Sequence, residues 1–126
     1  MTTLGVFGPQ YFVTCGGMKI VNNVTKAYIL NQPYNVTQVI TGDEPQGVCN
    51  QVRYTCKKNC MPYQEYKHCL YPSIELMVEK MIMNSDMFLL FTFFPESEIV
   101  DQAVNYAIKY NKSLSVVPLV NSSSNS

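Results

Sequence analysis

Short apolar runs alternate along the chain with longer stretches in which apolar positions return every three or four residues. The runs predict β-strands and the stretches predict amphipathic helices, because side chains repeat every 2 residues on a strand and about every 3.6 on a helix. The pattern predicts strands at 3–7, 36–41, 61–66, 86–92 and 114–119. It predicts helices at 17–30 and 48–59, a third beginning at Pro72, and a fourth capped by Ser97.

The same pattern predicts which side chains are buried. Residues 87–91 are apolar on both faces, as a central parallel strand requires. The predicted apolar stripe of the second helix consists of Val48, Val52, Cys56 and Cys60. The predicted buried side of the fourth helix consists of Ile99, Val100, Ala103, Val104, Ala107 and Ile108. For Phe93 and Phe94, core packing is favoured over stacking on a ligand, and both interpretations stay open.

The regular alternation of strands and helices predicts an α/β fold. We expect a single Rossmann-like, three-layer domain over residues 1–120, followed by a polar disordered tail at 121–126. Its five-stranded, mostly parallel sheet would carry helices on both faces. Ligands of such sheets bind outside the carboxyl ends of the strands, where the strand order reverses.

Three loops are predicted to meet at that edge of the sheet. The most distinctive is the glycine-containing turn at 41–48, which joins a strand to a helix. The first N–H groups of a helix have no partner within it, so anions such as phosphate bind there readily. The predicted ligand-binding residues of this edge are Gly8, Pro9, Gln10, Tyr11, Thr41, Gly42, Asp43, Gly47, Val48, Arg53, Phe93 and Ser97.

Composition limits the classes of partner. The chain has 9 basic and 9 acidic residues, so its net charge gives no reason to expect a nucleic acid or a membrane as partner. Charged residues make up only 14%, against roughly a quarter in an average domain, which favours a homo-oligomer. The odd number of cysteines, 5, and the lack of a secretory signal favour reduced thiols and a cytoplasmic location.

The order and spacing of these features resemble the SLOG superfamily of Rossmann-like domains. The similar segments are the first strand leading into Gly8, residues 39–42 followed by Gly47 and Val48, and the passage from Met83 through the apolar strand to Phe91. Because this group includes the lonely-guy phosphoribohydrolases, the Smf proteins and nucleotide-sensing domains of antiphage defence, the resemblance implies that the chain binds a nucleotide or a nucleotide-derived signal. A derivative of ADP-ribose, sensed or sequestered in a virus–host conflict, is one such ligand.

Three departures from the family pattern favour binding over catalysis. Cys49 stands where the family usually has an aspartate after the glycine turn, and residues 95–98 stand in place of its glycine-rich phosphate loop. Residues around Ser73 and Glu75 replace the Arg–Asn pair that usually opens the third helix. The chain is therefore predicted to be a binding protein that needs no cofactor.

Two other functions stay open. An enzyme that cleaves or exchanges N-glycosidic bonds would need a carboxylate near the anomeric carbon, and Glu98 or Asp101 is the candidate catalytic residue. Acidic residues at a helix start are also common without any catalytic role. The third possibility is a protein–protein interaction module.

Cys56, Cys60, His68 and Cys69 could in principle bind zinc, but their spacing is not that of a known zinc motif, so no metal is predicted. His68 is expected at the surface.

Overall fold

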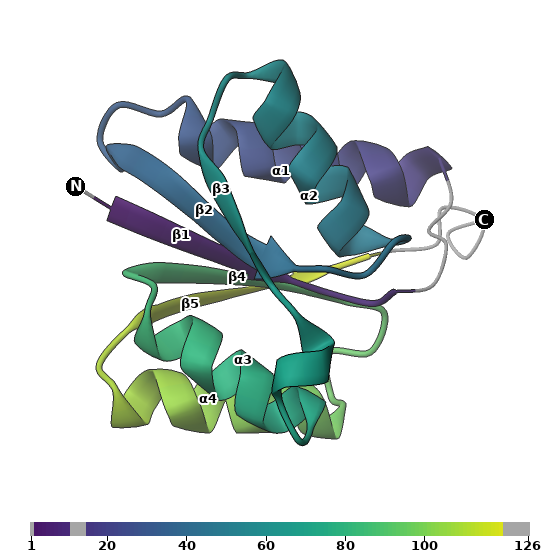
Figure 1. The fold of residues 1–126 in the computed structure, drawn as a ribbon, viewed down its shortest axis with the longest axis vertical. Helices are drawn as coiled ribbons and strands as arrows, with labels where there is room; N and C mark the ends of the chain where they lie inside the picture. The colour runs from purple at the N-terminus through teal and green to yellow at the C-terminus, as the bar shows by residue number, and fades with distance from the viewer. Residues whose placement is uncertain (1, 11–14, 120–126) are drawn as a thin grey trace.

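The computed structural model describes residues 2–10 and 15–119, in which five strands, four α-helices and one 3₁₀ helix form three layers (Figure 1). The order along the chain is β1 (Thr2–Phe7), α1 (Cys15–Ile29), β2 (Val36–Gly42), α2 (Val48–Lys58), β3 (Tyr63–Tyr66), η1 (His68–Leu70), α3 (Ile74–Met83), β4 (Met87–Thr92), α4 (Glu98–Lys109) and β5 (Ser113–Pro118). No helix in these residues is both long and apolar enough to cross a membrane.

The sheet is entirely parallel, with the strand order β3-β2-β1-β4-β5. The chain runs from β1 outward to β2 and β3, and then returns to the other side of β1 to form β4 and β5. Leu4 of the central strand is in register with Val39 on one side and with Met87 on the other. The order therefore reverses between β1 and β4, and the predicted α/β fold class is confirmed.

Each face of the sheet has its own hydrophobic core (Figure 1). Helices α1 and α2 cover one face, where Val21 and Val52 pack with Leu4 and Val39. Helices α3 and α4 cover the other face, where Met77, Val78, Met81 and Ile82 of α3 share one core with residues of β4. Phe88 and Leu90 of β4 belong to this second core, while Leu89 and Phe91 belong to the first. Strand β4 is thus buried on both faces, as predicted from its continuous apolar run.

Most predicted element boundaries lie within two residues of the observed ones, and two predictions at helix ends are wrong. Pro72 does not begin α3, because Ser73 is the N-cap and its side chain accepts a hydrogen bond from the Leu76 N–H at 3.2 Å. Cys60 does not continue the α2 stripe, because α2 ends at Lys58 and Cys60 turns into the left-handed region with φ of 55°. The helix η1 was not predicted, since its three residues are too few for a periodic pattern.

Three predictions of burial are also wrong. Phe94 is 73% exposed, because it lies in the turn after β4 beyond the reach of either core. Val104 and Ile108 are exposed because Val100, Ala103 and Ala107 form the stripe of α4 that packs against the sheet. The predicted homo-oligomer stays a prediction, as do the domain limits, since the tail at 121–126 lies outside the described residues.

Candidate functional site

A cavity of about 280 Å³ opens at the carboxyl edge of the sheet, where the strand order reverses between β1 and β4. Phe7 at the end of β1 and Leu90, Phe91 and Thr92 of β4 contribute to its wall. The other lining residues come from the following loops and helix starts: Gly8, Pro9, Gln10, Glu44, Ile74, Glu75 and Ile99. This is the position at which ligands bind in open parallel sheets.

The charges around this cavity are negative. Its lining includes two carboxylates, those of Glu44 and Glu75, and no lysine or arginine among the described residues. Gln10 and Thr92 add uncharged polar groups, while Phe7, Leu90 and Phe91 provide apolar surface. The lining suits a group that donates hydrogen bonds from an otherwise apolar body, whereas a phosphate inside the cavity would be repelled.

Glu44 is held in this wall by His68, which is itself held by Asp43. Glu44 Oε2 lies 2.8 Å from His68 Nε2, and Asp43 Oδ1 lies 2.7 Å from His68 Nδ1. The His68 backbone N–H also donates to Asp43 Oδ1 at 3.2 Å. The hydrogen bond between the two side chains lowers the pKa of Asp43 below its ordinary value of 3.8. Both ring nitrogens of His68 therefore face carboxylate oxygens, one from each of the two consecutive acidic residues.

The second oxygen of Glu44 is buried without a hydrogen-bond partner among the described residues. It lies 2.5 Å from the point where a Cβ would project from Gly42, and Cys49 Sγ lies 3.1 Å from that point. Burial, followed by the charge of Glu44, raises the pKa of the Cys49 thiol well above its ordinary range. Glu44 is only 4% exposed, so its carboxylate is desolvated, and the nearby Cys49 thiol is only a weak hydrogen-bond donor to it.

The loop after β1 covers the start of α2. The Pro9 carbonyl accepts the Val48 N–H at 3.0 Å, so the first N–H group of this helix is not free for an anion. Gly47 has φ of 83° and ψ of −150°, and a side chain there would collide with the Pro9 carbonyl oxygen. A side chain at Gly8 would come within 2.7 Å of Val48 Cγ2. These two glycines allow the loops to pack together, and only Gly8 of the pair lines the cavity.

Thr41 and Arg53, predicted to bind a ligand, bond instead to the backbone of neighbouring segments. Thr41 is fully buried and its hydroxyl donates to the Val6 carbonyl at 2.8 Å. Arg53 donates from Nη1 to the Gly42 carbonyl and from Nη2 to the Glu44 carbonyl, both at 2.7 Å. Arg53 therefore fixes the backbone on both sides of Asp43, and it positions the Glu44 side chain without lining the cavity.

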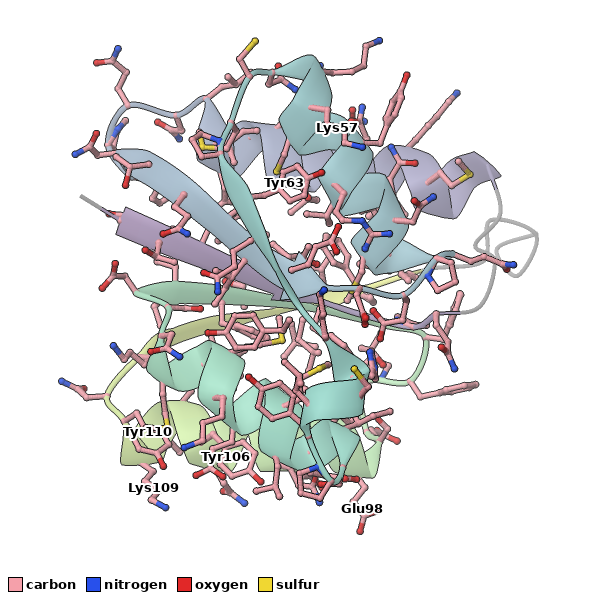
Figure 2. All side chains as sticks on the ribbon, in the orientation of Figure 1. Lys57, Tyr63, Glu98, Tyr106, Lys109 and Tyr110 are labelled. Atoms are coloured by element: carbon pink, nitrogen blue, oxygen red, sulfur yellow. The ribbon has the colours of Figure 1, made fainter. Side chains whose placement is uncertain are left out.

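The residues predicted around α4 do not line the cavity either. Phe93 is half-buried against the first core, and Ser97 is the N-cap of α4 with a buried Oγ that makes no hydrogen bond among the described residues. Glu98 and Asp101 lie in the first turn of α4 as predicted, and both are exposed (Figure 2 labels Glu98). Tyr11 lies outside the described residues.

The structure therefore brings together only part of the predicted site. Gly8, Pro9 and Gln10 line the cavity, and Asp43 supports its wall, while the carboxylate in that wall belongs to Glu44. The available signal for Glu44 was its position directly after β2, beside Asp43. His68 is not a plain surface residue, since it is half-buried between two carboxylates. The parallel pairing of Gly42 with Tyr66 explains why His68 lies beside Asp43 and Glu44. These residues belong to the segments that follow β2 and β3, and the two segments leave the sheet side by side.

The described cysteines do not form a shared site. Cys49 and Cys56 are buried, Cys60 and Cys69 are exposed, and all four are free thiols. Burial raises the pKa of Cys56 to about 11, so this thiol behaves as a small apolar group of the core. Within residues 2–10 and 15–119, no three His, Cys, Asp or Glu side chains are grouped so that they could hold a metal ion.

Comparisons with known proteins support the fold. No family model matches the chain, and no curated protein matches it by sequence. Its structure resembles that of the Moco carrier protein from Chlamydomonas reinhardtii, with a TM-score of 0.62 at 13% sequence identity. The alignment covers 92% of this chain and 75% of that chain. At this identity the likeness shows a Rossmann-like fold and nothing finer, so membership of the SLOG superfamily stays a prediction.

Proposed function

We propose that the chain binds a nucleotide or nucleotide-derived small molecule, and that the nucleoside part of the ligand occupies the cavity between β1 and β4. The observation that carries this proposal is the buried carboxylate of Glu44 in the cavity wall. One of its oxygens is held by His68, and the other makes no hydrogen bond that meets the geometric criteria among the described residues. In dinucleotide-binding folds a carboxylate hydrogen-bonds the ribose hydroxyls. Glu44 follows β2 at the same edge of the sheet and is assigned that role here.

The size and charge of the cavity define which part of the ligand enters. A volume of about 280 Å³ is near the lower end of the range for small-molecule sites, which suits one nucleoside rather than a dinucleotide. Glu44 and Glu75 would repel phosphates, so any phosphate of the ligand lies outside the cavity. A derivative of ADP-ribose fits this requirement, since its terminal sugar hydroxyls are separated from its phosphates. The resemblance to a structure named as a carrier protein agrees with binding and release of a small molecule.

The test is calorimetric titration with adenosine, adenosine 5′-monophosphate and ADP-ribose. We expect adenosine to bind at least as tightly as the monophosphate, because the cavity provides no cation for the phosphate. We expect Glu44→Gln to weaken binding by about 10- to 100-fold, since a hydrogen bond to a charged group contributes about 1.5–3 kcal/mol. Glu98→Gln is the matched control and should bind as the wild type does, because Glu98 is exposed and does not line the cavity.

Two results would contradict this proposal. One is the absence of binding by any compound that contains a nucleoside, and the other is unchanged affinity in a folded Glu44→Gln variant.

A second function, cleavage of the N-glycosidic bond, is favoured by the same buried carboxylate in the cavity wall. Chromatography of the titrated mixtures distinguishes the two, since released free base means turnover and intact ligand means binding alone.

A further inference from the structure

The charged residues of the helices are segregated between the two faces of the sheet. Helices α1 and α2 contain Lys19, Lys26, Arg53, Lys57 and Lys58 and no acidic residue. Helices α3 and α4 contain four acidic residues and only two lysines, which are Lys80 and Lys109. Figure 2 shows Lys57 on one side of the sheet and Glu98 on the other. Net charge does not detect this segregation, so overall neutrality does not exclude an anionic partner.

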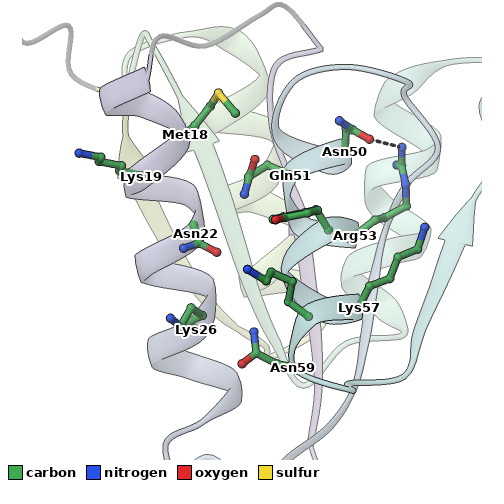
Figure 3. Close-up of a pocket in the computed structure, with 11 residues that line it drawn as sticks. Met18, Lys19, Asn22, Lys26, Asn50, Gln51, Arg53, Lys57 and Asn59 are labelled. Carbon is green, nitrogen blue, oxygen red and sulfur yellow. Dashed lines mark hydrogen bonds between the residues drawn. The ribbon is translucent and has the colours of Figure 1, made fainter.

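The basic residues of α1 and α2 line one open groove of about 700 Å³ on the surface of these two helices. The helices are joined beneath it by a 2.7 Å hydrogen bond from Thr55 Oγ1 to Asn22 Oδ1. Figure 3 shows Lys19, Asn22 and Lys26 on α1 and Asn50, Arg53 and Lys57 on α2. Lys19 points away from α2, and Arg53 and Lys57 lie on the side of α2 that faces away from α1. Five of the nine basic residues of the chain line this groove, and no acidic residue does.

The lysines of the groove have no acidic partner. Lys19, Lys26, Lys57 and Lys58 form no ion pair in the described part of the chain, whereas Arg53 lies 3.4 Å from Glu65. Four ammonium groups on two adjacent helices repel one another, and a bound anion would remove that repulsion. In residues 2–10 and 15–119, these four lysines of the groove therefore lack an acidic partner.

We propose that this groove binds single-stranded nucleic acid through its phosphate backbone. The lysines supply the charge, and amide side chains such as Asn22, Asn50 and Gln51 can bond to phosphate and sugar oxygens. Tyr54 is 52% exposed in the same groove, with Lys58 Nζ 5.6 Å from its ring centre, and offers a surface on which a base can stack. An acidic protein segment could use the lysines but would gain nothing from stacking on Tyr54, so we favour nucleic acid.

The test is fluorescence anisotropy with a labelled oligouridine of about 12 nucleotides, within the length that a single-strand binding groove contacts. Four lysine–phosphate contacts predict that log K falls with log salt concentration with a slope of about −3, since each contact in a single strand contributes about −0.7. The double variants Lys19→Gln with Lys26→Gln, and Lys57→Gln with Lys58→Gln, should each reduce the magnitude of the slope by about 1.4. Tyr54→Ala should weaken binding about 5- to 100-fold at an unchanged slope, because stacking does not release counterions.

The matched control is the double variant Lys80→Gln with Lys112→Gln, which removes the same charge outside the groove and should bind with the wild-type slope. The proposal is overturned if the wild type does not bind at about 50 mM salt. It is also overturned if the control loses as much affinity as the groove variants, or if a polyglutamate peptide competes as well as unlabelled oligouridine. Circular dichroism verifies that each variant is folded. The groove and the cavity at the sheet edge share no lining residue. A negative result for nucleic-acid binding therefore does not test the proposed function, and a negative result for nucleoside binding does not test this proposal.

Discussion

Glu44 has a defined conformation because residues from three segments constrain it. His68 holds Oε2 of its carboxylate, Arg53 holds its backbone carbonyl, and Gly42 leaves the space that Oε1 occupies. The sequence allowed prediction of a glycine-containing turn after β2, and Asp43 was placed in the site as part of that turn. It did not allow prediction of His68, because the pairing of His68 with Asp43 depends on two strands that meet only in the folded sheet.

The Asp43–His68 contact makes stability depend on pH. We expect Asp43→Asn to lower the free energy of unfolding at pH 7 by about 1 kcal/mol, measured by urea denaturation. The folded-state pKa of Asp43 is lowered, so its contribution is fully present above the ordinary pKa of 3.8 and disappears as the pH falls through the folded-state value. The difference between wild type and variant should therefore shrink below pH 3.8. A difference that stays constant from pH 7 to acid would contradict this role for the contact.

At the scale of elements, apolar periodicity was sufficient to predict the strands and the α-helices, because each buries a regular stripe in one of two cores. It was not sufficient at the helix ends. Ser73 and Ser97 are both N-cap serines, yet only the Ser73 side chain accepts a hydrogen bond from its helix. Serine is a good N-cap at both positions, but the backbone differs, with φ of −153° at Ser73 and −75° at Ser97.

The two caps provide a matched pair of variants. We expect Ser73→Ala to lower the free energy of unfolding by about 1 kcal/mol, since the hydrogen bond to the Leu76 N–H is lost. Ser97→Ala should be neutral or slightly stabilising, because it removes a buried hydroxyl that has no hydrogen-bond partner. Chemical denaturation of the two variants measures the difference. Equal losses would mean that Ser97 also caps its helix in solution.

In the molecule as a whole, the strand order determines which loops and helix starts lie close enough to form a binding site. The reversal between β1 and β4 brings the loop after β1, the loop after β2 and the starts of α3 and α4 around one cavity. The sequence predicted this edge as the binding region, and the cavity lies there. It did not predict that the Pro9 carbonyl would cover the start of α2, because this contact joins two loops that are distant in the sequence. We therefore propose that the sugar hydroxyls of the ligand bind the carboxylate of Glu44, whereas the sequence had predicted a phosphate at the start of α2.

The location of the ligand can be measured directly by two-dimensional ¹H–¹⁵N NMR during titration with adenosine. We expect the largest chemical-shift changes at the residues around the cavity, namely Gly8, Gln10, Glu44, Glu75 and Thr92. Amides of α1 and of the exposed end of α2 should not change. Shifts confined to the groove on α1 and α2, or no shifts at saturating adenosine, would contradict the assignment of the ligand to the β1–β4 cavity.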